Sequence, residues 1–189
     1  MQDFISFLKG FHAIDDSILE QYVSEWKEFS VGKRQLMRAE GEVEKYLYYV
    51  LEGVQKSYFL HKNKEHVIAF AYPPSFSGIP DSFLTQTPSR YYMETISKSH
   101  FLRISYEQHH KFMEEHREIE TLFRKITEFF LYGVIQRQHE IMALSMEDRF
   151  KAFVGRSAHL LQSIPQKDIA SYLNIDPTNF SKLINRIRI

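Results

Sequence analysis

Between residues 46 and 104 the chain alternates short runs of β-forming, often aromatic residues with turn signals, and no other feature restricts the fold as strongly. The runs read YLYYVL, VQKSYFL, HVIAFAY, YYMETI and HFLRI, with turn segments such as LHKNKEH, YPPSFSG and TQTPSR between them. Each run has the length and composition of a β-strand. Five or more such strands at roughly ten-residue spacing predict a sandwich or a jelly-roll barrel.

Helical periodicity precedes and follows this β-rich region. The segment DDSILEQYVSEWK, residues 15–27, has apolar residues at helical spacing behind acidic ones and predicts an amphipathic helix. After Ser105 the helical period returns for about forty residues, with an apolar seam of Ile119, Phe123, Ile126, Phe130, Val134, Ile141 and Leu144. A stripe this narrow and long is typical of a coiled-coil seam, so we expect a dimerisation helix. The alternative is a long helix that lies against its own β-domain.

The segment IPQKDIASYLNIDPTNFSKLINR, residues 164–186, predicts two short helices joined by a tight turn. A further helix is expected before it, at about Met146–Gln162. Pro165 suits the first turn of a helix, and Asn174 favours the left-handed conformation that the turn requires. Asp176 followed by Pro177 predicts the N-terminal cap of the last helix. The inward face of that helix is expected to consist of Phe180, Leu183, Ile184 and Ile187.

This is the spacing of a helix-turn-helix, with the small Ala170 allowing the helices to approach. The outer face of the last helix carries hydrogen-bonding and cationic side chains and no acidic ones, so it can enter a major groove. From Arg149 onward there are seven Lys or Arg residues against two acidic ones, and 17 against 22 before it. This asymmetry favours a polyanion as partner. A plain helical hairpin is the alternative.

Composition excludes several classes of protein. The chain has no cysteine, which rules out disulfides, thiolate metal sites and iron–sulfur clusters. No apolar run approaches the ~18 residues of a membrane span, and the N-terminus lacks the features of a signal peptide. We therefore expect a cytoplasmic protein with no membrane partner.

The sequence contains no P-loop, no G-x-S-x-G elbow and no Gly-rich dinucleotide loop, so we expect neither an enzyme nor a cofactor. The nine histidines include a cluster in HHKFMEEH, formed by His109, His110 and His116 with Glu114. We interpret this cluster as part of a solvated helix rather than a metal site. A cupin-type metalloenzyme is the rival hypothesis.

Taken together, the order of these segments resembles the Crp/Fnr family of bacterial transcription regulators over nearly the whole chain. The stretch YLYYVLEGVQKSYF is similar to the family's hairpin, with Gly53 in the turn, and PPSFSGIPDSFL is similar to its ligand-pocket segment. The most specific likeness is IPQKDIASYLNIDPTNFSKLI, which is similar to the family's helix-turn-helix motif. The resemblance implies a homodimer joined along the central helices, with each recognition helix in one half-site of a palindromic operator.

The ligand-pocket segment also departs from the family pattern. In members that bind cyclic AMP the pocket glycine is followed by a glutamate for the ribose, whereas here Gly78 is followed by Ile79. The arginine that binds the phosphate falls at Ser89, with Arg90 one place late. An isoleucine cannot accept the sugar's hydrogen bonds, and unpaired buried hydroxyls are costly. We expect that cyclic AMP does not bind, although Gly78, Ser89 and Arg90 remain the candidate ligand-binding residues.

We therefore expect an α+β chain with a jelly-roll (double-stranded β-helix) domain at residues 1–115, a central dimerisation helix at 116–145 and a helix-turn-helix domain at 146–189. The expected function is sequence-specific DNA binding as a transcription regulator. Thr178 and Lys182, followed by Asn179 and Asn185, are candidates for base contacts, and the candidates for phosphate contacts are Gln166, Lys167, Ser181 and Arg186. An unidentified small-molecule effector and RNA polymerase are further partners to consider. The alternative function is a ligand-binding β-roll whose terminal helices mediate protein contacts.

Overall fold

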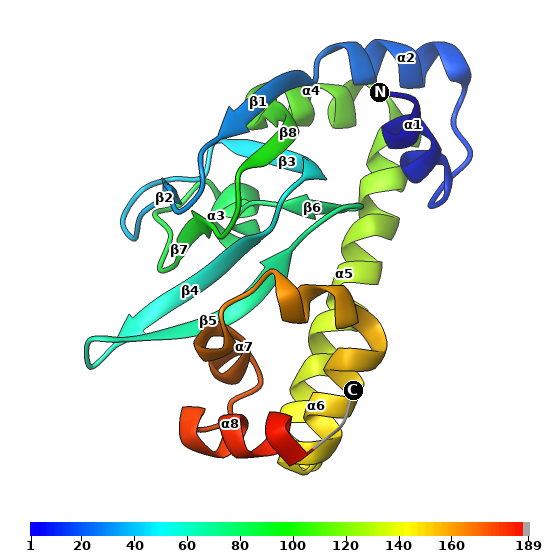
Figure 1. The fold of residues 1–189 in the computed structure, drawn as a ribbon. Coiled ribbons are helices and arrows are strands. Elements are labelled where there is room, and N and C mark those ends of the chain that lie inside the picture. The colour runs from blue at the N-terminus through cyan, green and yellow to red at the C-terminus, as the bar shows by residue number, and fades with distance from the viewer. Residues whose placement is uncertain (187–189) are drawn as a thin grey trace.

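The computed structural model describes residues 1–186 and contains two four-stranded antiparallel sheets that form a β-roll (Figure 1). One sheet has the strand order β1-β8-β3-β6 and the other β2-β7-β4-β5. The strands are β1 (Lys27–Val31), β2 (Leu36–Arg38), β3 (Tyr46–Glu52), β4 (Gln55–His61), β5 (Lys64–Ala71), β6 (Ser75–Ser77), β7 (Tyr92–Thr95) and β8 (Ser99–Ser105). The five expected runs are β3, β4, β5, β7 and β8, while the sequence pattern missed β1, β2 and β6.

Helices precede and follow the strands of the β-roll, and one short helix lies between β6 and β7. They are α1 (Gln2–Lys9), α2 (Asp16–Ser24), α3 (Pro80–Thr85), α4 (Tyr106–Glu115), α5 (Arg117–Ala143), α6 (Met146–Ser157), the 3-10 helix η1 (Ala158–Gln162), α7 (Gln166–Tyr172) and α8 (Pro177–Arg186). The expected amphipathic helix is α2, and the carboxylate of Asp15 caps it by accepting hydrogen bonds from the backbone N–H groups of Ser17 and Ile18. The helices α1 and α3 were not expected.

The region of helical period after Ser105 is divided at His116 into α4 and α5, and α5 occupies most of residues 116–145. His116 has extended backbone angles (φ −130°, ψ 104°), and its imidazole stacks on Phe112 of α4. The break turns the chain so that α4 packs beside the first turns of α5, and α5 then runs along one side of the molecule (Figure 1). The helix expected at Met146–Gln162 likewise changes to a 3-10 helix after Ser157.

Three apolar clusters hold these elements together. The first lies between the sheet that contains β3 and β8 and the helices α1, α2, α4 and the start of α5, and includes Phe4, Tyr22 and Leu102. The second lies inside the β-roll around Tyr48 and Phe101. The third joins α6, η1, α7 and α8, and it also contains Val54 and Ile96 of the β-roll. The C-terminal helices therefore share their core with the β-roll.

Candidate nucleic-acid interface

The α7–α8 unit is a pair of short helices joined by a turn at Asn174. Asn174 has a left-handed backbone (φ 52°), and the N–H of Ile175 donates to the carbonyl of Ala170 at 2.9 Å. The carboxylate of Asp176 accepts hydrogen bonds from the N–H groups of Thr178 (2.9 Å) and Asn179 (3.3 Å) and so begins α8. These details agree with the turn and the cap that the sequence predicts. Pro165 differs from expectation, because it is the N-cap of α7 rather than part of its first turn.

The inward face of α8 anchors the helix. Phe180 and Leu183 are buried, and the ring of Phe180 meets that of Phe150 on α6 edge to face, with centroids 5.6 Å apart. Ile184 is half-buried, and Ile187 lies outside the described residues. Because α8 is fixed by this apolar face, the direction in which its other side chains project is set by the fold.

The outward face of α8 gathers the residues that the sequence analysis assigned to DNA. They are all exposed: Thr178, Asn179, Ser181, Lys182, Asn185 and Arg186. No acidic residue lies between Pro177 and Arg186, so this face presents hydrogen-bond donors, acceptors and positive charge. Arg186 pairs with Glu147 of α6, and both side chains are solvent-accessible. Such an exposed pair is weakened by solvent and leaves the guanidinium available to a phosphate.

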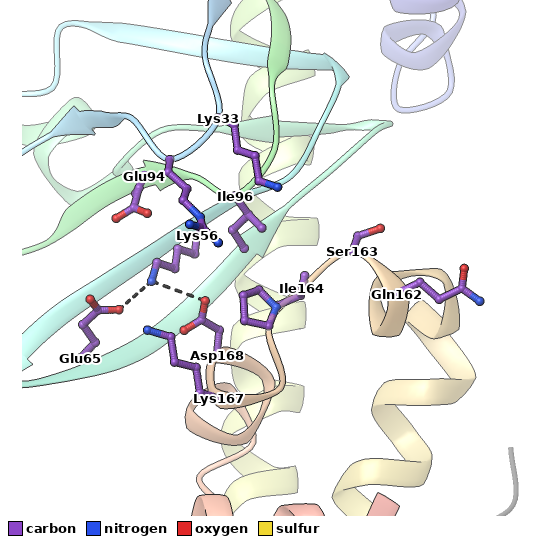
Figure 2. A pocket seen from close by; sticks show the side chains of 12 residues that line it. Lys33, Lys56, Glu65, Glu94, Ile96, Gln162, Ser163, Ile164, Lys167 and Asp168 are labelled. Carbon is purple, nitrogen blue, oxygen red and sulfur yellow. Dashed lines mark hydrogen bonds and ion pairs between the residues drawn. The ribbon is translucent and has the colours of Figure 1, made fainter.

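Gln166 and Lys167, the two other candidates, lie at the start of α7 rather than on α8. Both are exposed. Lys167 lines a cavity between α7 and the β-roll, together with Lys33 and Lys56 (Figure 2). The structure therefore brings six of the eight candidates together on one helix and sets these two apart.

A buried ion pair connects the α7–α8 unit to the β-roll, and the sequence analysis did not identify it. The ammonium of Lys56 on β4 lies 2.6 Å from a carboxylate oxygen of Glu65 and 3.5 Å from one of Asp168 on α7 (Figure 2). Burial by itself lowers the pKa of Lys56, but the hydrogen bond to Glu65 and the nearby carboxylate charges, including Asp168, raise it above its usual value. Lys56 is thus held in its charged form. A lysine among aromatic strand residues was the available sequence signal.

Two further contacts secure α7 on the outside of β5. The hydroxyl of Ser171 accepts a hydrogen bond from the N–H of Val67 at 2.9 Å and donates to the carbonyl of Glu65 at 3.2 Å. Tyr172 packs its ring on Phe70, and the guanidinium of Arg137 from α5 lies 3.5 Å from the centroid of the Tyr172 ring. The strand β5, the long helix α5 and α7 therefore meet at one place.

The candidate ligand-binding residues of the β-roll do not form a polar pocket. Ile79 is buried in the interior cluster with Tyr48 and Phe101. The hydroxyl of Ser89 donates to the carbonyl of Tyr91 and accepts from its N–H, while the Ser89 backbone bonds to the loop at residues 41–42. Arg90 is exposed. Gly78 adopts φ 135°, in the region that favours glycine, and the residue that follows it is the buried Ile79.

The apolar seam expected along the central helix is divided in two, which corrects the sequence analysis. Ile119 and Phe123 are buried in the first cluster of the same chain, and Ile126 packs against it. Phe130 and Val134 are exposed, whereas Ile141 and Leu144 are half-buried. The seam therefore serves the chain's own core at its beginning and is open to solvent only in the middle of α5.

Several apolar side chains in the second half of α5 are exposed, and four that share one side of the helix, including Val134 of the expected seam, form what we call the α5 stripe. Leu131, Val134, Ile135 and Met142 are all exposed, Met142 at 78%, and they lie within about 100° of one another around the helix. Phe130 borders this stripe. Runs of exposed large apolar side chains are uncommon on monomeric proteins and mark interaction surfaces. Within residues 1–186, no helix is both long and apolar enough to cross a membrane.

Histidines do not gather into a metal site in the described part of the chain. No group of three or more His, Asp or Glu side chains there is placed to hold a metal ion. His109 is buried and its Nδ1 lies 2.9 Å from the hydroxyl of Tyr22, and His110 faces Glu114 at 3.4 Å. The two neighbouring histidines thus have separate partners.

Comparison with known proteins agrees with this architecture. Residues 28–116, which include most of the β-roll, match the family described as the cyclic nucleotide-binding domain. No curated protein sequence matches the chain. Structural neighbours were found among bacterial regulators of the Crp/Fnr type.

The fold is similar to FixK2 from Bradyrhizobium japonicum, with a TM-score of 0.74 at 19% identity over 85% of this chain and 83% of that one. It is also similar to CLP, a c-di-GMP responsive global regulator of Xanthomonas campestris, with a TM-score of 0.64 at 15% identity over 91% of both chains. The fold is similar as well to the catabolite activator protein of Thermus thermophilus, with a TM-score of 0.58 at 15% identity over 93% of this chain and 84% of that one. The chain has the fold of these regulators: a β-roll, a long helix and a helical C-terminal region.

Proposed function

We propose that this protein is a homodimeric, sequence-specific DNA-binding transcription regulator of the Crp/Fnr type, active in the bacterial cytoplasm. The single observation that carries the proposal is the outward face of α8, which is exposed, free of acidic residues and fixed in direction by buried Phe180 and Leu183. A face of this kind approaches phosphates without repulsion and presents side chains to base edges. Thr178 and Lys182 are assigned to base edges, with Asn179 and Asn185 beside them.

The phosphate contacts are assigned to Gln166, Lys167, Ser181 and Arg186. Lys182 reaches a guanine edge as a single point charge, whereas an arginine in its place would make two parallel hydrogen bonds. The operator is therefore expected to differ from those that arginine-bearing regulators read.

The α5 stripe is proposed to be the dimer interface. Two stripes packed against each other would remove Leu131, Ile135 and Met142 from water and would carry two α8 helices in a symmetric pair. Such a pair reads half-sites about 34 Å, one turn of DNA, apart. RNA polymerase is the partner through which a bound regulator would act on transcription.

Cyclic AMP is not proposed as the effector. Ile79 fills the position of the family's ribose acceptor with a buried apolar side chain, and Arg90 points to solvent rather than into the β-roll. Calorimetric titration of the full chain with cyclic AMP is expected to give no heat of binding. Micromolar affinity would overturn this part of the proposal.

The test of the function is selection of bound duplexes from a random-sequence pool by the purified full chain. We expect enrichment of a palindrome with half-sites one helical turn apart, and we expect Lys182→Ala to reduce that enrichment. Lys62→Ala, at the exposed tip of the β4–β5 hairpin, is the matched control and should enrich the same sequence. Absence of any duplex affinity at low salt would favour the alternative, a β-roll whose terminal helices bind another protein.

A further inference from the structure

A cavity of about 550 Å³ lies between the β-roll and the α7–α8 unit, and its lining is unusually rich in charge (Figure 2). Its walls include four cationic side chains and three carboxylates, contributed by both parts of the chain. The cations are Lys33, Arg34, Lys56 and Lys167, and the carboxylates are those of Glu65, Glu94 and Asp168. The volume is within the range of small-molecule sites, which is about 300–1,000 Å³.

The charges at the base of the cavity already neutralise one another. Lys56 is paired with both Glu65 and Asp168, so these three groups contribute little attraction to a further ion. The other charged side chains in the lining are three cations, Lys33, Arg34 and Lys167, and one carboxylate, that of Glu94. Within residues 1–186, none of these three cations has a carboxylate oxygen within 4.0 Å of its side-chain nitrogens.

These cations come from opposite walls of the same space. Lys33 and Arg34 belong to the β1–β2 loop of the β-roll, and Lys167 belongs to the first turn of α7. Figure 2 shows the ammonium of Lys33 directed into the cavity from the β-roll and Lys167 reaching upward from α7. Like charges that face one space repel each other, and an anion placed between them removes that repulsion.

We propose that this cavity is a binding site for a small polyanion, a phosphate ester or a polycarboxylate, held by Lys33 and Arg34 on one side and by Lys167 on the other. Glu94 adds selectivity, because its carboxylate accepts a hydrogen bond from a ligand hydroxyl group. Ile96, Ile164 and Pro165 form an apolar wall for the carbon skeleton of the ligand.

The position of the site gives it a consequence for α8. A ligand that bridges Lys33 and Lys167 fixes α7 against the β-roll, and α8 is attached to α7 through the shared apolar core. Ligand binding would therefore restrict the orientations that the two α8 helices of a dimer can adopt. This restriction would change the affinity of the dimer for DNA. This regulatory consequence rests on the proposed function, whereas the binding site itself does not.

The experiment is calorimetric titration of the full chain, without DNA, using ribose 5-phosphate as the phosphate probe and citrate as the carboxylate probe. At least one of them is expected to bind with a Kd below about 1 mM. Lys33→Ala and Lys167→Ala should each weaken that binding about tenfold, because each removes a charge-assisted contact. Both side chains are exposed, so the variants should retain the melting temperature of the parent. Lys62→Ala is the matched control and should bind the probe unchanged.

Two results would overturn the site: no heat with either probe, or binding that neither Lys33→Ala nor Lys167→Ala weakens. The proposed function is tested by a different measurement, the binding of DNA duplexes, so its failure can be distinguished from failure of the ligand site. Lys182→Ala should lose operator discrimination while its affinity for the probe stays the same. Lys33→Ala should leave unliganded duplex binding intact and abolish the effect of the probe on it.

Discussion

Lys56 on β4 and Asp168 on α7 form an ion pair at 3.5 Å with both side chains about nineteen-twentieths buried. Burying a charged group costs free energy unless the group is paired with an opposite charge. Because Lys56 and Asp168 are both buried, α7 has to stay in the orientation that keeps them paired. Glu65 completes the arrangement from the neighbouring strand.

Removing one member of this group is expected to destabilise the whole chain. Asp168→Asn leaves the buried ammonium of Lys56 with Glu65 alone, and we expect the free energy of unfolding to fall by about 2 kcal/mol. Urea denaturation followed by circular dichroism measures the change. Glu147→Gln, which breaks only exposed pairs, is the control and should leave stability close to that of the parent. Equal stability of Asp168→Asn and the parent would show that the pair does not hold α7.

Charge placed in the α5 stripe is expected to separate the proposed dimer. Ile135→Glu introduces two carboxylates into a symmetric interface and removes two apolar side chains, each worth about 2 kcal/mol when buried. We expect the dimer dissociation constant to rise by about 100-fold or more. Sedimentation equilibrium gives the constant directly. Gln136→Glu lies on another face of α5 and should leave it unchanged; equal effects of the two substitutions would argue against the stripe as interface.

Two substitutions on α8 are expected to affect DNA binding in different ways. Lys182→Ala should lower discrimination between operator and unrelated duplex by about 1 kcal/mol, because a base contact is lost. Arg186→Ala should weaken binding to all duplexes alike and reduce the slope of log K against log salt by about 1. Fluorescence anisotropy at several salt concentrations measures both quantities. Identical isotherms for both variants and the parent would contradict the assignment of α8.

His109 is expected to make the stability of the chain depend on pH. Burial, followed by the charge of His110, lowers the pKa of His109 to about 4. In the unfolded chain a histidine has a pKa near 6.5, so between about pH 6.5 and 4 the unfolded state binds a proton that the folded state does not. Stability therefore falls as the pH is lowered through this window, by at most about 3 kcal/mol from this residue.

The measurement is urea denaturation at several pH values between 4 and 7. His109→Asn keeps a hydrogen-bond acceptor near Tyr22 and should reduce the slope of stability against pH by up to about 1.4 kcal/mol per pH unit. His139→Asn, at an exposed position of α5, is the control. A slope that survives His109→Asn would assign the pH dependence to other groups.

Gly53 in the β3–β4 turn is expected to tolerate no side chain. It has φ 92°, and a Cβ atom there would lie 2.4 Å from Oγ of Ser99 and 2.5 Å from the carbonyl oxygen of Lys98. We expect Gly53→Ala to cost more than about 2 kcal/mol, since a steric clash adds to the backbone strain. Gly41 has a similar φ of 87° with no atom within 4 Å of a Cβ, so Gly41→Ala isolates the strain and should cost about 1 kcal/mol. Thermal unfolding compares the two variants, and equal losses would contradict the clash.

The features that sequence predicted correctly are governed by local chemistry. Asn174 adopts the left-handed conformation, and Asp176 caps α8, because each outcome depends on neighbours within a few residues. The five β-rich runs became strands for the same reason, since their composition and turns are local signals. The candidate base contacts on α8 are all exposed, and their assignment to DNA stays a prediction.

The features that sequence missed depend on residues distant in the chain. Ile119 and Phe123 fit a coiled-coil seam, but they are buried because α1 and α2 bring Leu19, Tyr22 and other apolar side chains over them. The pairing of Lys56 with Asp168 joins a strand to a helix far along the chain, and no spacing rule connects them.

The shared core at the base of the β-roll has a consequence for how such a protein can diversify. Val54 and Ile96 belong to the β-roll but lie in the same apolar cluster as Ile169 and Phe180 of the α7–α8 unit. An unrelated helix pair transplanted onto this chain would leave those two side chains facing water. New recognition properties are therefore accessible through point substitutions on the outward face of α8, and not through exchange of the C-terminal helices as an interchangeable part.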